Sequence, residues 1–135
     1  MGTYTEFHFN IELIPDTPSE VLKVLAHMNN PDAMPRPSSL PEHPFFKTEQ
    51  WNLLFGHVTG DMFPFVARGV FRRDNIGRMF INIRTDIRNH DDGIQKFVDW
   101  ILPYVFMESD LDEFLGFYRS DLEREPHLIF GDSTT

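Results

Sequence analysis

Four arginines in the middle of the chain carry the side chains best suited to bind a ligand. Arg68, Arg72, Arg84 and Arg88 lie close together in the sequence. The guanidinium group is a planar fork of donors that fits phosphate and carboxylate oxygens. We therefore treat these arginines as candidates for holding an anionic group. The full set of candidate ligand- or partner-binding residues is Arg68, Arg72, Asn82, Arg84, Arg88, His8 and Trp51.

The residues around these arginines alternate in character, which predicts strands. In residues 78–88, the odd positions hold mainly methionine and isoleucine, and most even positions are polar. Period-two alternation is typical of a strand with one buried and one exposed face. Residues 3–14 alternate in the same way, and residues 63–73 form a further expected strand. The exposed face is expected to carry Glu6, His8, Asn10, Glu12, Arg68, Arg72, Asn82, Arg84, Asp86 and Arg88.

Three interpretations of this exposed face remain open. A ladder of opposite charges across neighbouring strands would keep the sheet soluble, and each pair contributes roughly 0.2–1 kcal/mol. Alternatively, the arginines form a platform that binds an anion, a nucleotide or an acidic partner. A register shifted by one residue would exchange the two faces, so that the arginine face would be covered.

No catalytic or metal-binding pattern stands out in the chain. The sequence has no cysteine, which excludes disulfides and thiolate metal sites. Its six histidines are scattered and include no pair at the i, i+4 spacing of a helical zinc motif. We find no glycine-rich phosphate loop and no nucleophile elbow. We therefore predict no catalytic residues, no metal and no cofactor, and we favour a binding protein over an enzyme.

Acidic residues gather toward the end of the chain. Residues 108–125 contain seven carboxylates and two arginines. A solvated edge explains such a segment, and the alternative is an acidic patch that imitates nucleic acid and blocks a basic protein. The candidate residues of this patch are Glu108, Asp110, Asp112 and Glu113.

Composition and charge restrict the class of protein. The chain has 135 residues and a net charge of −9, which argues against binding to nucleic-acid backbone. The first six residues lack the features of a signal peptide, and no apolar run approaches the roughly 18–20 residues that span a bilayer. We expect a cytoplasmic protein that does not enter the membrane. Its 14 phenylalanines exceed what a small core readily hides, so a homodimer or partner interface stays open.

The order of expected elements indicates an α+β fold. A strand at residues 3–14 is followed by a helix that begins in the Thr-Pro-Ser-Glu capping box at 17–20. The proline-rich loop 31–44 and an apolar segment at 45–55, read as a short helix, lead to a hairpin of two strands with a four-residue connection at 74–77. A second helix, capped near residues 89–92, precedes strands at 114–118 and 128–130.

This order predicts a ferredoxin-like (split βαβ) antiparallel sheet of four to five strands, with two helices on one face. The first and third strands are expected to be central neighbours, with the second strand beside the third. We expect one domain over residues 1–135, with a loose tail at 131–135.

Several short motifs point to a family. They include Tyr-Thr-Glu-Phe at 4–7, Asp-Thr-Pro at 16–18, Leu-Pro-Glu-His-Pro-Phe at 40–45, Asp-Trp-Ile-Leu-Pro-Tyr at 99–104 and Phe-Leu-Gly-Phe-Tyr at 114–118. In these motifs the chain resembles a family of short, uncharacterised proteins of tailed bacteriophages and prophages. The resemblance implies a non-enzymatic accessory protein in the host cytoplasm that binds a host protein or signal, as a host-takeover or anti-defence inhibitor. The alternatives are a protein that sequesters a small anionic ligand or nucleotide on the arginine face, and an immunity-type inhibitor with an acidic surface.

Overall fold

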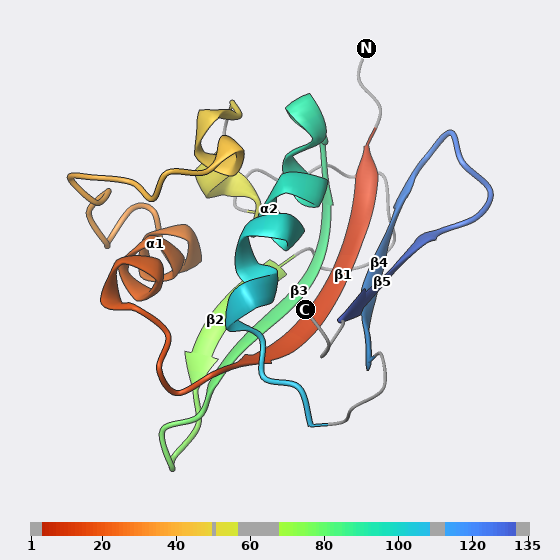
Figure 1. Cartoon of the computed structure of the whole chain (residues 1–135). Coiled ribbons are helices and arrows are strands. Elements are labelled where there is room, and N and C mark those ends of the chain that lie inside the picture. Colours follow the sequence, from red (N-terminus) through yellow and green to blue (C-terminus); the bar gives the residue numbers. More distant parts are fainter. Residues whose placement is uncertain (1–3, 50, 57–67, 109–112, 132–135) are drawn as a thin grey trace.

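The computed structural model describes residues 4–49, 51–56, 68–108 and 113–131. Within them, five strands form one antiparallel sheet in the order β2-β3-β1-β4-β5, accompanied by two α-helices (Figure 1). The strands are β1 (Thr5–Leu13), β2 (Arg68–Arg73), β3 (Met79–Ile87), β4 (Glu113–Ser120) and β5 (His127–Gly131), and the helices are α1 (Ser19–Asn29) and α2 (Gly93–Ile101). None of the described helices is both long and apolar enough to cross a bilayer.

The α+β class, the antiparallel sheet and the two helices are confirmed. β1 is central and pairs with β3 on one side and β4 on the other, and β2 pairs with β3. β5 adds an edge strand next to β4, which takes the order beyond a simple four-stranded split βαβ sheet. The first part of the strand expected at 63–73, up to residue 67, lies outside the described residues.

The alternating residues of β1 and β3 divide the sheet into two faces, as expected. Phe7, Phe9 and Ile83 are almost completely buried on the face toward the helices. Figure 1 shows α1 and α2 on this same side of the sheet. Phe97 of α2 fills the space between the layers, and its ring centroid lies 5.4 to 6.3 Å from those of Phe7, Phe9 and Phe45. The core is therefore a single aromatic-rich layer between helices and sheet.

The start of α1 differs from the expected cap, whereas the start of α2 agrees with it. The Thr17 hydroxyl donates to the Ile14 carbonyl at 2.6 Å, and α1 begins after Pro18 without a side-chain cap, so the predicted capping box is wrong. Proline fixes its own backbone dihedral in the helical range and lacks an N–H, which suits this position. At α2, Asn89 Oδ1 accepts from the Ile94 N–H at 2.8 Å, so a cap lies in the predicted region 89–92.

The described residues between α1 and β2, 30–49 and 51–56, are irregular. Residues 31–43 contain no helix or strand, as their five prolines in 31–44 predict. The helix expected in 45–55 is wrong, because two short 3₁₀ helices, Pro44–Lys47 and Trp51–Leu53, stand there instead. Their aromatic residues pack inward, and Phe45 stacks on Trp100 with ring centroids 5.9 Å apart. Burial of these rings therefore fixes the segment where helical periodicity does not.

One turn and one close approach between strands depend on glycine in this sheet. The β2–β3 connection spans residues 74–78, one more than predicted, because the Asp74 N–H donates to the Arg78 carbonyl at 2.9 Å. Gly77 within it has φ +89°, which favours glycine. Across the sheet, a Cβ on Gly116 would lie 1.8 Å from the His8 carbonyl oxygen, so glycine allows β4 to approach β1.

Candidate functional site

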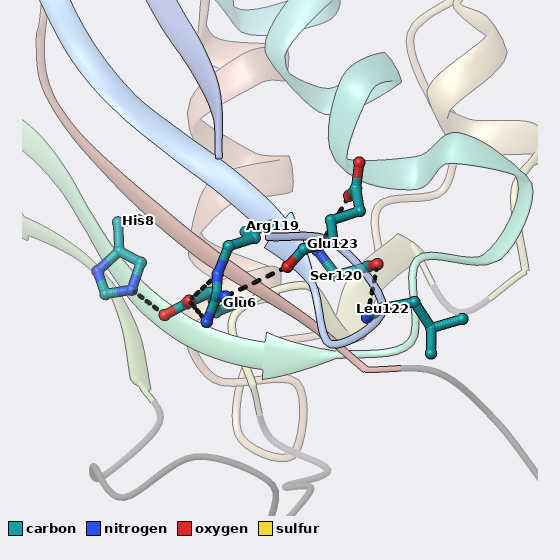
Figure 2. A network of polar contacts seen from close by, with 6 residues as sticks. All are labelled: Glu6, His8, Arg119, Ser120, Leu122 and Glu123. Carbon is teal, nitrogen blue, oxygen red and sulfur yellow. Dashed lines mark hydrogen bonds and ion pairs between the residues drawn. The ribbon is translucent and has the colours of Figure 1, made fainter. Parts of the chain in front are cut away.

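A polar network joins β1 to β4 on the face opposite the helices (Figure 2). The Glu6 carboxylate is its centre: Arg119 Nε donates to it at 3.0 Å, and His8 Nε2 lies 3.1 Å from it. The His8 ring stacks on Phe117 with centroids 4.4 Å apart. Arg119 also donates a hydrogen bond from Nη1 to the Glu123 carbonyl oxygen at 3.3 Å. His8, a candidate residue, is thus engaged by its neighbours.

The network ends at the β4–β5 turn, where a carboxylate and a histidine meet. Glu123 accepts a hydrogen bond from the Ser120 N–H and contacts His127 Nε2 through its other oxygen. The hydrogen bond with His127, followed by that from Ser120, lowers the pKa of Glu123 below its ordinary value. This pair closes the β4–β5 turn.

Arg72, one of the two candidate arginines of β2, also contacts its neighbours. Arg72 Nε donates to Asn82 Oδ1 at 2.8 Å, and Asn82 Nδ2 donates to Asn10 Oδ1 at 3.1 Å. The Arg72 guanidinium lies 4.4 Å from the Phe80 ring centroid, a cation–π distance. A chain of contacts therefore crosses β2, β3 and β1, and it consists of hydrogen bonds to asparagine amides rather than of the opposite-charge pairs of the ladder interpretation.

The other arginines sit at one end of this face. Arg68 lies directly opposite Arg84 across the β2–β3 pairing, and the Arg88 guanidinium lies 5.5 Å from the Tyr4 ring centroid. Both Arg84 and Arg88 are exposed. Asp86 was expected among the exposed residues, but it is 1% exposed, so that expectation is wrong. Strand alternation assigns a residue to a face, and a face can still be covered locally.

Trp51 and the acidic candidate residues lie away from the arginines of the sheet face. Trp51 is 4% exposed and packs in the core against Phe46, with ring centroids 5.1 Å apart. Glu113 Oε1 accepts from the Glu108 N–H at 2.9 Å, and both residues line a hollow of about 140 Å³ between β1 and β4. The remaining acidic candidates, Asp110 and Asp112, lie outside the described residues.

A larger groove, of about 690 Å³, lies between α1, the proline-rich loop and β2. One wall is a face of α1 that carries Ser19, Leu22, Lys23 and Ala26, which share the face through their i, i+3, i+4, i+7 spacing. The opposite wall is loop 34–39, and Phe71 and Arg73 of β2 complete the lining. We call this hollow the α1–loop groove.

Three cations from three different elements line the α1–loop groove: Lys23 of α1, Arg36 of the loop and Arg73 of β2. All three are exposed, and within the described part of the chain none of them forms an ion pair. The Arg36 guanidinium lies 5.3 Å from the Trp51 ring centroid. Glu20 is the one carboxylate among the described residues of the lining. The groove is thus locally positive on a chain with a net charge of −9.

Sequence reasoning missed the α1–loop groove for a physical reason. Lys23, Arg36 and Arg73 are far apart in the sequence and share no motif. Strand alternation does predict one part of the groove. Arg72 lies on the exposed face of β2, so the next residue, Arg73, lies on the face toward the helices. The fold of the proline-rich loop, which brings Arg36 back over α1, leaves no periodic pattern. Arg119, which donates to Glu6 in the β1–β4 network, was missed because the expected fourth strand ended at residue 118.

Among the described residues, no three histidine, aspartate or glutamate side chains gather as metal ligands. The chain matches no family model, no curated protein and no solved structure in the comparisons.

Proposed function

We propose that this chain is a non-catalytic binding protein that holds a small anionic molecule in the α1–loop groove. The observation that carries the proposal is the meeting of Lys23, Arg36 and Arg73 at one hollow of about 690 Å³. Cations on an acidic protein usually lie next to carboxylates, and here three of them surround a space. A phosphate or carboxylate in that space would be attracted by all three.

The size and lining of the α1–loop groove narrow the ligand class. Pockets for small molecules have volumes of roughly 300–1,000 Å³ and combine apolar walls with a few polar groups. Leu22, Met34 and Phe71 supply apolar surface, while the cations and the loop serines supply polar groups. This combination supports a ligand with an apolar or aromatic body and an anionic end, such as a nucleoside phosphate.

The sheet supports the ferredoxin-like plan as part of this proposal. The neighbours β2-β3-β1-β4 support this plan, while the edge strand β5 departs from a simple split βαβ sheet. Together with the resemblance to tailed-phage proteins, the groove supports an accessory role in which the chain sequesters a small signal in the host cytoplasm. Binding to the arginine-bearing sheet face is less supported, because Arg72 is already bonded to Asn82.

Calorimetric titration and thermal shift with nucleoside phosphates, inorganic phosphate and dicarboxylates test this function. We expect at least one nucleoside phosphate to bind and to raise the unfolding midpoint, since a ligand that binds the folded state stabilises it. The double variant Lys23→Gln/Arg73→Gln should bind at least tenfold more weakly, on the order of 1.4 kcal/mol. The matched control is Arg124→Gln, which removes an exposed arginine away from the groove.

A second variant separates the two candidate surfaces. If Arg72→Gln abolishes binding while Lys23→Gln/Arg73→Gln does not, the ligand sits on the sheet face and the groove proposal is wrong. Absence of any response across the panel would also contradict the proposal.

A further inference from the structure

The two edge strands of the sheet, β2 and β5, differ in the hydrogen bonding of their outer sides. At β2, the Gly69 N–H donates to the Phe55 carbonyl at 2.7 Å, and the Phe71 N–H donates to Asn29 Oδ1 at 3.0 Å. These bonds occupy donors on the outer side of β2. At β5, on the opposite edge (Figure 1), the described residues supply no backbone partner other than β4. Within the described part of the chain, one edge is therefore capped and the other is open to a further strand.

The open edge carries an apolar patch. Leu128 and Phe130 of β5 are 56% and 48% exposed, and Phe114 of β4 is 57% exposed. Phe114 lies opposite Phe130, with ring centroids 5.7 Å apart. These three residues form what we call the β5 edge patch. Natural edge strands commonly carry lysine, an inward-pointing charged residue or proline, which prevents pairing with another strand. β5, His127–Gly131, contains no lysine, carboxylate or proline.

We propose that β5 pairs antiparallel with β5 of a second copy of this chain, forming a continuous sheet across a two-fold axis. The alternation of β5 makes the strand complementary to itself. With Ile129 at the axis, Leu128 lies beside Phe130 of the second copy, and Phe130 lies beside its Leu128. His127 then lies opposite a glycine, Gly131, which leaves room for the imidazole. An isologous contact of this kind is the usual form of a protein dimer.

Charge favours a second copy at this place. Two copies that each carry −9 repel one another, so a self-contact costs least along a strand with no carboxylate of its own, as β5 is, although Glu123 contacts His127 and Glu113 lies opposite Gly131. The area of the β5 edge patch sets the strength of the dimer. Three half-exposed large side chains supply roughly 300 Å² per copy, compared with about 800 Å² per partner in a standard interface. The dimer is therefore weak and depends on concentration.

Sedimentation velocity of the full chain at increasing protein concentration tests this interface, which is independent of the groove. The wild type shifts from monomer toward dimer as the concentration rises. The variant Leu128→Lys/Phe130→Lys stays monomeric, because lysine on an edge strand prevents pairing. The control Leu122→Lys places one lysine on a residue that is 80% exposed but precedes β5, and it dimerises like the wild type. Far-UV circular dichroism verifies that both variants are folded.

Hydrogen exchange on the wild type provides a test that needs no variant. Backbone amides of β5 exchange more slowly at high concentration, while those of β2 are unchanged. A wild type that stays monomeric at every concentration overturns the proposal, as does a dimer that survives Leu128→Lys/Phe130→Lys. A dimer without slowed exchange in β5 overturns the strand pairing.

Discussion

Phe97 shows how much one residue contributes to this fold. Its fully buried ring contacts strands and the 3₁₀ segment at once, as its distances to Phe9 and Phe45 show. Phe97→Ala should lower the free energy of unfolding by about 3–5 kcal/mol, because it removes a large apolar side chain and leaves a cavity. Urea unfolding measures this loss. Phe114→Ala is the control, since that ring is 57% exposed and its removal should change stability by less than about 1 kcal/mol. Equal losses for the two variants would contradict the described core.

Asp74 is the residue whose ionisation should affect stability. Partial burial acts to raise its pKa, but hydrogen bonds from the side chain and N–H of Arg78 and from the Ile76 N–H outweigh it, so the pKa lies below the ordinary 3.8. A carboxylate whose folded pKa is depressed stabilises the protein above its unfolded pKa, and this contribution disappears as the pH falls through the folded pKa.

Asp74→Asn isolates this effect, because asparagine keeps an oxygen that accepts from the backbone and loses the charge. We expect the wild type to be more stable than the variant at about pH 6, with the difference shrinking toward about pH 3. Thermal unfolding across this range measures it. Asp16→Asn, at an exposed site, should follow the wild type at every pH. A difference between wild type and Asp74→Asn that stays constant with pH would rule out the assigned ion pair with Arg78.

At the scale of elements, the regular strands were predictable and the irregular segments were not. The alternation of residues 78–88 located β3 to within one residue at each end, because a sheet with one buried face imposes a period of two. The 3₁₀ helices Pro44–Lys47 and Trp51–Leu53 follow no period, since burial of Phe45 and Trp51 holds them. The capping box in 17–20 failed because the N-cap position is Pro18, so Thr17 lies one residue too early to cap α1, and its hydroxyl donates to the Ile14 carbonyl instead. A local sequence pattern therefore predicts the structure incorrectly where a tertiary or turn contact determines the backbone instead.

The candidate site shows the same division between local and tertiary information. Sequence reasoning selected the arginines of the sheet because alternation assigns them to one face, and the structure does place Arg72 and Asn82 together. It missed the α1–loop groove because that site depends on where an aperiodic loop returns. The elements that bring Lys23, Arg36 and Arg73 together are separated by long stretches of chain, and no spacing rule connects them.

At the scale of the whole molecule, the net charge of −9 and the cationic groove respond to salt in opposite directions. Like charges repel across the folded surface, and this repulsion weakens as the screening length falls from about 30 Å at 0.01 M salt to about 8 Å at 0.15 M. We therefore expect the unfolding midpoint of the free protein to rise over this range. The attraction between a phosphate and the groove is screened by the same ions, so its affinity should fall.

Differential scanning calorimetry and ligand titration in the same buffers measure the two trends. Lys23→Gln/Arg73→Gln, which makes the chain more acidic, should strengthen the dependence of the unfolding midpoint on salt and weaken the dependence of ligand binding on salt, because only Arg36 of the three cations then remains. Ligand affinity that does not change with salt would mean that the groove cations do not contact the anionic group. A midpoint that falls as salt is added would mean instead that the pairs of the sheet face, such as Glu6 with Arg119, outweigh the repulsion of the remaining carboxylates.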